Sequence, residues 1–151
     1  MTKKVMIVTG GSRGIGAEIA TLGAADGYAV CISYVKNKAA ADTVVAAIRE
    51  AGGTAIAVAA DMAVEADILR LFATVDQELG TLTALVNNAG ILETQMRVDQ
   101  MDVARMQRIF NTNIVGAFVC AREAVKRMST KYGGAGAVSY THLTLPTIYS
   151  V

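Results

Sequence analysis

Apolar and polar positions along the chain follow two patterns that alternate. Short apolar runs, typical of strands buried on both faces, are separated by longer segments in which apolar residues recur every three or four positions, as on one face of a helix. The short runs predict strands at residues 5–8, 29–34, 54–60 and 82–86. The longer segments predict helices at residues 13–26, 38–51, 64–79, 98–110 and 113–128.

This regular alternation of strand and helix predicts an α/β fold. Strand–helix–strand units of this length wind with right-handed crossovers into a parallel sheet that carries helices on both faces. We expect a Rossmann-like, doubly wound parallel sheet with strand order 3-2-1-4, formed by residues 1–137 and truncated after the fifth or sixth helix. A ligand would bind at the carboxyl ends of the strands.

A glycine-rich turn joins the first predicted strand to the first predicted helix. It reads Thr9-Gly10-Gly11-Ser12-Arg13-Gly14-Ile15-Gly16. Gly10 permits a tight turn, Gly14 lets a ligand approach the backbone, and Gly16 lets the helix and the strand pack closely. The free N–H groups and the positive dipole end of the helix would then face an anion. The turn predicts a pyrophosphate site; the alternative is a strand-to-helix connection without a ligand.

Composition narrows the partner and the location. A net charge of +1 gives no electrostatic footprint for nucleic acid or for an anionic membrane, so we expect a small-molecule partner. No apolar run reaches the roughly 18 residues of a membrane helix, and no signal peptide is recognisable, which indicates a cytoplasmic protein. Cys31 and Cys120 belong to no Cys-x-x-Cys pair, so we expect buried free thiols and no metal site.

Three further segments, together with the glycine-rich turn, carry a resemblance to a known family. They are Asp61-Met62 after the third strand, Asn87-Asn88-Ala89-Gly90 after the fourth, and Asn113-x-x-Gly116 at the start of the last helix. With the turn, they resemble the classical short-chain dehydrogenase/reductase family over about residues 3–137. The resemblance implies hydride transfer between a nicotinamide cofactor and a small-molecule carbonyl or secondary alcohol.

The resemblance also implies roles for individual residues. Asp61 would contact the adenine beside the backbone N–H of Met62, and Asn113 would be the catalytic asparagine, which holds a water that relays protons. The cofactor would be bound by Thr9, Gly10, Ser12, Arg13, Gly14, Ile15, Gly16, Tyr34, Lys36, Asp61, Met62, Asn88, Ala89 and Gly90. Family members usually form tetramers, partly through the helix at residues 113–128, so a homotetramer is expected.

Three of these residues have a purely structural alternative. Asp61 could cap the following helix, Asn88 could be a turn residue that tolerates unusual dihedral angles, and Asn113 could be an N-cap.

The end of the second strand indicates which nicotinamide cofactor is preferred. An NAD-selective site usually places a carboxylate there, which binds the ribose 2′-hydroxyl and repels a 2′-phosphate. This chain has Ser33-Tyr34-Val35-Lys36 without an acid, and Arg13 lies in the glycine-rich turn. We therefore expect NADP(H), with NAD(H) as the alternative cofactor; the alternative explanation of Arg13 and Lys36 is solvated surface charge.

The other catalytic residues implied by the resemblance are not identified. The family uses a serine, a tyrosine and a lysine four residues after the tyrosine, but Tyr140 is followed by Thr144, and Tyr149 has no room for a partner. Ser139 stands too near the start of its segment to match the serine. We expect an inactive N-terminal fragment of an NADP(H)-dependent oxidoreductase; the alternative is a non-catalytic protein that senses NADP(H).

The last segment, residues 138–151, differs in character from the rest of the chain. It contains the only histidine and the only proline, and residues 138–147 resemble the translation of a sequencing-library adapter. We expect a non-native tail there. The alternative is a natural fifth strand over residues 138–142.

Overall fold

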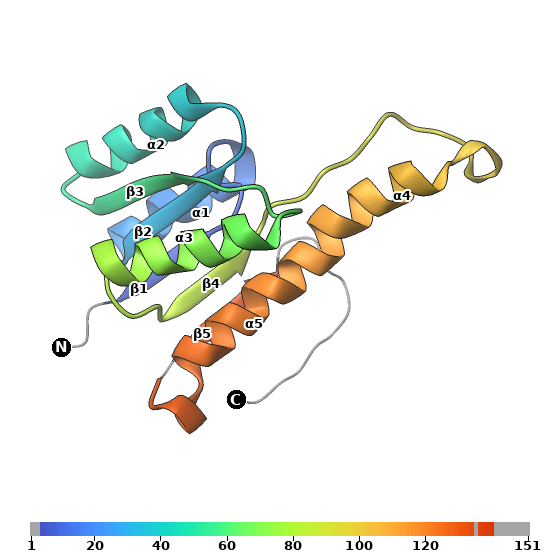
Figure 1. Cartoon of the computed structure of the whole chain (residues 1–151). Helices are drawn as coiled ribbons and strands as arrows, with labels where there is room; N and C mark the ends of the chain where they lie inside the picture. The colour runs from blue at the N-terminus through green and yellow to red at the C-terminus, as the bar shows by residue number, and fades with distance from the viewer. Residues whose placement is uncertain (1–3, 135, 141–151) are drawn as a thin grey trace.

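The strands form one parallel sheet. The computed structural model describes residues 4–134 and 136–140. Its strands are β1 (Val5–Val8), β2 (Ala29–Tyr34), β3 (Thr54–Ala59), β4 (Ala84–Asn87) and β5 (Ala137–Tyr140). They lie in the order β3-β2-β1-β4-β5, and every neighbouring pair is parallel (Figure 1). The predicted Rossmann-like sheet with the order 3-2-1-4 is confirmed.

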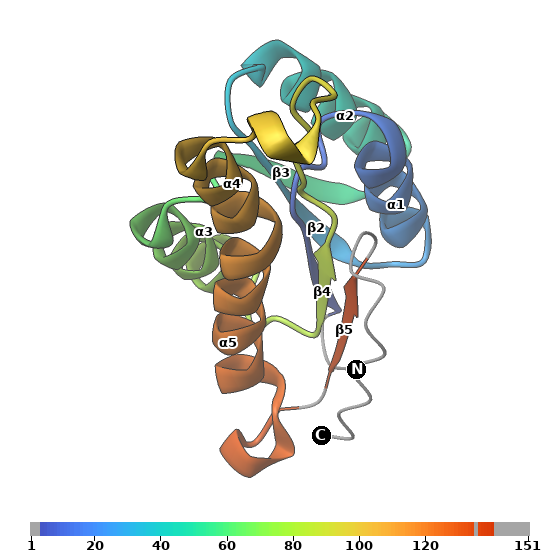
Figure 2. The ribbon, with the colours of Figure 1, turned by 90° about the vertical axis from the view of Figure 1, so that its right-hand side faces the viewer.

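Helices cover both faces of this sheet. The helices α1 (Gly14–Ala25) and α2 (Lys38–Glu50) lie on one face, and α3 (Glu65–Glu78) and α5 (Ala117–Met128) lie on the other (Figure 2). Because helices lie on both faces, almost every residue of β1, β2 and β4 is buried. This burial explains why these strands are continuous apolar runs rather than alternating ones.

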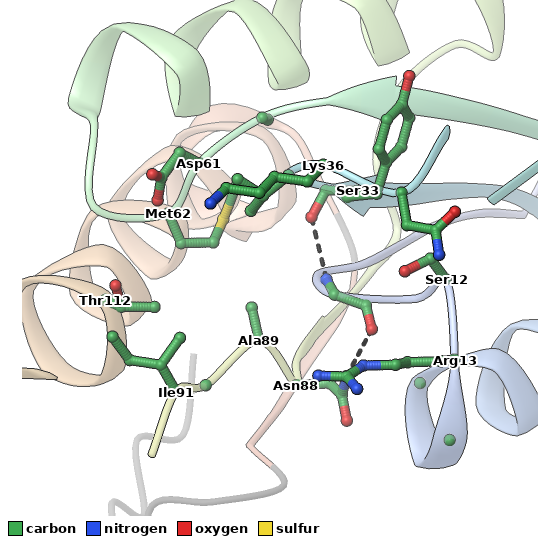
Figure 3. Close-up of a pocket in the computed structure, with 18 of the residues that line it drawn as sticks. Ser12, Arg13, Ser33, Lys36, Asp61, Met62, Asn88, Ala89, Ile91 and Thr112 are labelled. Carbon is green, nitrogen blue, oxygen red and sulfur yellow. Dashed lines mark hydrogen bonds between the residues drawn. The ribbon is translucent and has the colours of Figure 1, made fainter. Parts of the chain in front are cut away.

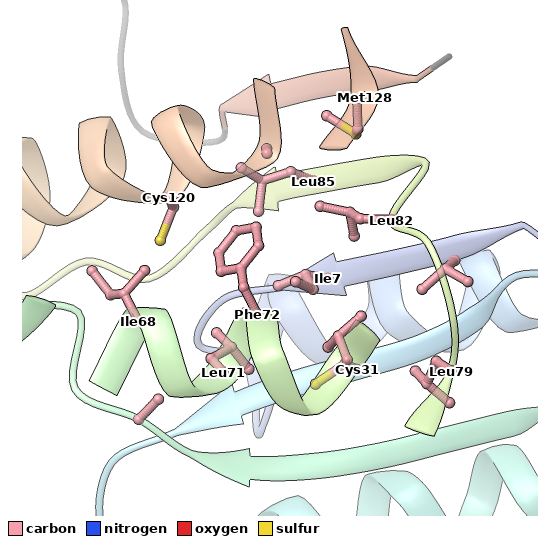
Figure 4. Packing of buried hydrophobic residues seen from close by; sticks show 14 of the residues in the cluster. Ile7, Cys31, Ile68, Leu71, Phe72, Leu79, Leu82, Leu85, Cys120 and Met128 are labelled. Carbon is pink, nitrogen blue, oxygen red and sulfur yellow. The ribbon is translucent and has the colours of Figure 1, made fainter. Parts of the chain in front are cut away.

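The larger core cluster lies between the sheet and the helices α3 and α5 (Figure 4). Phe72 is its largest fully buried side chain and comes from the apolar stripe of α3. Cys31 on β2 and Cys120 on α5 belong to the same cluster and are free thiols, as expected. Burial raises the pKa of Cys31 and raises that of Cys120 to about 12, so both stay protonated near neutral pH.

The C-terminal helices differ from the prediction. The segment expected to form one helix over residues 98–110 contains a short 3-10 helix, η1 (Val98–Gln100), and then α4 (Val103–Phe110). The break falls there because the Oδ1 atom of Asp102 accepts the backbone N–H of Arg105 at 2.7 Å, which caps α4.

The predicted break before residue 113 is wrong. A π-helical turn, η2 (Asn111–Gly116), joins α4 to α5, and the three segments form one long rod (Figure 1). Asn111 itself has helical dihedral angles, with φ −60° and ψ −45°. A wide turn of this kind lets a helix continue and is frequent at functional sites. Asn113 therefore lies inside the helix, and the alternative that it is an N-cap is wrong.

The edge of the sheet beside β4 is occupied by β5. The short 3-10 helix η3 (Thr130–Tyr132) follows α5, and β5 then pairs with β4 in a register that sets Ala137 beside Ala84 and Tyr140 beside Asn87. Residues 138–140 of the expected tail thus lie in a strand of the sheet. Residues 141–151, the rest of that tail, lie outside the described residues.

Candidate functional site

A pocket of about 830 Å³ opens at the carboxyl ends of the strands (Figure 3). It is lined by Gly10, Ser12, Arg13, Gly14, Ile15, Gly16, Ser33, Tyr34, Val35, Lys36, Asn37, Ala40, Ala60, Asp61, Met62, Asn88, Ala89, Gly90, Ile91 and Thr112. The structure thus brings together all of the expected cofactor-binding residues except Thr9. Asn113 is also absent from the lining.

The glycine-rich turn forms one wall of the pocket. Gly10 has φ +66°, and an added Cβ would stand 3.0 Å from the Cα of Ala89, so the turn and the end of β4 approach each other closely. Gly14 has φ +55°, but an added Cβ would meet no atom within 4 Å. It is the first residue of α1, so its backbone faces open pocket space at the positive end of a helix.

Ser33 is the most important contact in this wall that sequence reasoning missed. Its Oγ accepts the N–H of Gly10, and its carbonyl oxygen accepts the N–H of Gly11, both at 3.0 Å. Ser33 is only 1% exposed. The available signal was one small polar residue near the end of a strand that is otherwise apolar up to that point. The other lining residues missed were Val35, Asn37, Ala40, Ala60, Ile91 and Thr112.

Thr9 and Asn88 join the glycine-rich turn to the end of β4. Thr9 is buried, and its Oγ1 accepts the backbone N–H groups of Asn88 and Ala89, both at 3.0 Å. The side-chain amide of Asn88 donates to the carbonyl oxygens of Thr9 and Gly10 at 2.9 and 3.1 Å. Thr9 therefore supports the pocket from behind, while Asn88 both lines it and fixes the turn.

The end of β2 contributes one cation, Lys36, and no acid to the lining. Tyr34 and Lys36 line the pocket, and the Oδ1 of Asn37 caps α2 by accepting the N–H of Ala40 at 2.9 Å. The spacing Tyr-x-x-x-Lys does occur here, at Tyr34 and Lys38. Lys38, however, pairs with Asp42 at 2.7 Å on the exposed side of α2, and this partner raises its pKa. These two residues belong to the β2 side of the sheet, whereas Asn113 contacts the segment after β4.

The end of β3 contributes Asp61 and Met62. Asp61 donates its N–H to Asp67 Oδ2 at 2.9 Å and accepts the N–H of Ala63 on its own Oδ1 at 2.8 Å. The bond from Asp61 and the neighbouring Arg70 lower the pKa of the Asp67 carboxyl. The helix α3 begins after Val64 without a side-chain cap, so the alternative that Asp61 caps it is wrong.

Asn113 holds the segment that follows β4. Its Oδ1 accepts the N–H of Ile91 at 2.8 Å, and its Nδ2 donates to the carbonyl oxygen of Ile91 at 2.9 Å. Two residues further on, Glu93 forms ion pairs with Arg105 and Arg108 of α4, at 3.2 and 2.7 Å. The hydrogen bond from Arg108 lowers the pKa of Glu93. Asn113 thus acts on the pocket edge through Ile91.

These features suit an anionic ligand of small-molecule size. The volume lies in the range of small-molecule sites, and Gly14 leaves a cradle that any Cβ would fill. The α1 N-terminus and the lining cations Arg13 and Lys36 favour negative charge.

Among residues 4–134 and 136–140, no cluster of three or more His, Cys, Asp or Glu side chains could hold a metal ion. Within the same residues, no helix is both long and apolar enough to cross a membrane.

Comparisons with known proteins agree with this geometry. The family model described as short chain dehydrogenase matches residues 4–138. The uncharacterized oxidoreductase YgfF of Escherichia coli is 47% identical over 132 residues, which cover 87% of this chain and 53% of YgfF. The 3-oxoacyl-[acyl-carrier-protein] reductase of Synechocystis is 37% identical, over 89% of this chain and 54% of that protein.

Solved structures give the same result. A short chain dehydrogenase from Burkholderia cenocepacia, in complex with NADP, superimposes with a TM-score of 0.83 and 36% identity, over 91% of this chain and 54% of that one. The chain spans about half the length of the relatives it matches. On the family model and these relatives together, the chain belongs to the short-chain dehydrogenase family.

Proposed function

We propose that the pocket binds NADP(H), with the pyrophosphate at the glycine-rich turn. The observation that carries the proposal is Gly14, which has a positive φ, open space where a Cβ would stand, and a place at the first turn of α1. A backbone this open beside a helix N-terminus can receive a phosphate oxygen. The Burkholderia cenocepacia neighbour, solved with NADP, supports the same class of ligand.

The charges around the pocket favour NADP(H) over NAD(H). Arg13 and Lys36 line the pocket and would pair with a 2′-phosphate, while the residues from Ser33 to Lys36 include no carboxylate to repel it. Asp61 would accept a hydrogen bond from the adenine amino group, beside the N–H of Met62.

We propose that the whole protein interconverts a small-molecule carbonyl and a secondary alcohol. The bound cofactor supplies or accepts the hydride, and Asn113 would hold the edge of the site through Ile91. The reductase from Synechocystis supports a carbonyl substrate. Val115 of η2 and Phe118 of α5 have exposed side chains. They support an oligomer formed through this part of the helix, in line with the expected homotetramer.

We propose that turnover needs the serine, tyrosine and lysine that the resemblance implies and that were not identified in the 151-residue chain. We propose that the 151-residue chain binds the cofactor without turnover, and that residues 138–151 depart from the natural protein. Sequencing the genomic locus past codon 136 tests this proposal. We expect a frame that continues through a strand ending in serine to a Tyr-x-x-x-Lys motif; a genome that encodes residues 138–151 followed by a stop would contradict it.

The cofactor proposal is tested by titrating NADPH and NADH into protein expressed from the complete genomic frame. NADPH should bind more tightly, and Arg13→Glu should weaken NADPH about 10- to 100-fold, since a charged hydrogen bond is replaced by repulsion. NADH should change little. Lys131→Glu, with the same charge change outside the lining, is the control. If neither cofactor binds, the proposed site is refuted. If both cofactors lose the same affinity in Arg13→Glu, Arg13 does not determine the preference for NADPH.

A second candidate function is a non-catalytic NADP(H) sensor. It is favoured by one observation, that the Tyr-x-x-x-Lys spacing occurs only at Tyr34 and Lys38, on the β2 side of the sheet. Tight NADPH binding without reduction of any carbonyl, by protein from the complete frame, would select this candidate over the enzyme.

A further inference from the structure

Two residues of the continuous helix formed by α4, η2 and α5 contact Met62, in the part of the pocket proposed to face the adenine. At Gly116, an added Cβ would overlap the carbonyl oxygen of Met62 and would stand 2.9 Å from its carbonyl carbon and 3.1 Å from its Cβ. One turn later, the thiol of Cys120 donates to Met62 Sδ at 3.6 Å. Gly116 and Cys120 are four residues apart, so they lie on one face of the helix. Both are buried, and Met62 is only 4% exposed.

The same short segment is held from its other side by α3. The N–H of Asp61 is bound at 2.9 Å by the carboxylate of Asp67, in the first turn of α3. An ion pair at 2.8 Å between Arg127 of α5 and Asp76 of α3 ties the two helices together. Asp61 and Met62 therefore lie between two linked helices, and their position depends on how closely α5 can approach.

We infer that Gly116 and Cys120 are positioning residues for the adenine-binding wall. The missing side chain at Gly116 allows the helix backbone to touch the Met62 peptide, and Cys120 fixes the Met62 side chain from the same helix face. Together they set where the Asp61 carboxylate and the Met62 N–H stand. The inference rests on the proposed nucleotide site.

Base specificity is a property that would stay unchanged if Gly116 and Cys120 only stabilised the fold. Adenine offers an amino donor and a ring-nitrogen acceptor, which complement a carboxylate and an N–H group. Hypoxanthine offers the reverse, an oxygen acceptor and an N–H donor. The ratio of the dissociation constants of NADPH and its hypoxanthine analogue therefore reports the position of this wall, while a uniform loss of affinity or stability cancels in it.

The experiment compares this ratio among variants of the protein from the complete genomic frame. The unsubstituted protein should prefer NADPH at least about tenfold, because the analogue leaves the Asp61 carboxylate and the Met62 N–H mispaired. Gly116→Ala should lower the ratio at least about threefold by pushing Met62 away. Gly53→Ala is the matched control: its Cβ would stand 2.8 Å from Cγ2 and 3.1 Å from the carbonyl oxygen of Ile48, before β3 begins, and it should leave the ratio unchanged.

A second variant keeps the test decisive if Gly116→Ala does not fold. Cys120→Ala removes the contact with Met62 Sδ without adding bulk, and it should lower the ratio in the same direction by a smaller factor. An unchanged ratio in every folded variant, or no base preference in the unsubstituted protein, would overturn the inference. Failure of the unsubstituted protein to bind NADPH at all would instead overturn the proposed function.

Discussion

Besides the adenine-binding wall, the pocket is bordered by two regions that are held in place in different ways. The glycine wall, residues 9–16 with the end of β2, is fixed by hydrogen bonds between the ends of neighbouring strands, such as those of Gly10 and Gly11 to Ser33. The β4 wall, residues 89–97 with α4 and η2, is fixed by side chains that reach back from a helix. Asn113 binds Ile91 across 22 positions, and Arg108 binds Glu93 across 15.

The residues that support the glycine wall from behind are more buried than the segment that follows β4. Thr9 and Ser33 behind the glycine wall are each 1% exposed, whereas Ile91 and Leu92 of the β4 wall are 38% and 95% exposed. Water competes for hydrogen bonds at exposed positions, so we expect the segment around Ile91 and Leu92 to open more readily than the sheet unfolds. Substitutions in the glycine wall should therefore act on affinity, and substitutions in the β4 wall should act first on local order.

The largest effect is expected when a side chain is added to a glycine of the glycine wall. Gly14→Val would place a side chain in the space proposed for the pyrophosphate and should weaken both NADPH and NADH at least about 100-fold. Gly27→Val is the matched control, because Gly27 also has a positive φ, +84°, and no atom within 4 Å of an added Cβ. Titration calorimetry and thermal melting distinguish the two: both variants should lose stability through backbone strain, and only Gly14→Val should lose binding. Equal binding losses would place the effect in the backbone rather than in the pocket.

The two walls also differ in how far the sequence predicted them. The glycine wall follows from local signals, a strand, a glycine-rich turn and a helix within 25 residues, and the pocket is lined by Gly10, Gly14 and Gly16 of that turn. In the β4 wall, the predicted break before Asn113 was wrong, because Asn111 and Asn113 are typical capping residues that here lie inside a π-helical turn. The two bonds of Asn113 to Ile91 are tertiary contacts that no local pattern encodes.

A smaller effect is expected when the contacts of the β4 wall with the helix are removed. Asn113→Ala removes both bonds to Ile91 and should cost about 1–2 kcal/mol of local stability, since each neutral hydrogen bond contributes about 0.5–1.5 kcal/mol. Hydrogen exchange at the Ile91 amide should speed up, while amides of β1 keep their protection. Asn111→Ala, an exposed position in the same turn, is the control and should leave Ile91 unchanged. Unchanged exchange at Ile91 in Asn113→Ala would mean that this wall is not held from the helix.

The smallest effect, and the finest test of the comparison, is expected at Glu93. The hydrogen bond from Arg108, with the charge of Arg105 nearby, holds the pKa of Glu93 below its usual range. A carboxyl whose pKa is lower in the folded state stabilises that state above its unfolded pKa, and the contribution disappears as the pH falls through the folded value. Glu93→Gln should therefore speed hydrogen exchange of residues 92–97 near neutral pH, and the difference from the unsubstituted protein should vanish in acid. Glu50→Gln, an exposed position on α2, is the control and should change nothing in this segment. A difference that persists unchanged into acid would show that Glu93 acts by packing and not by its charge, and the β4 wall would then resemble the glycine wall more closely than its ion pairs indicate.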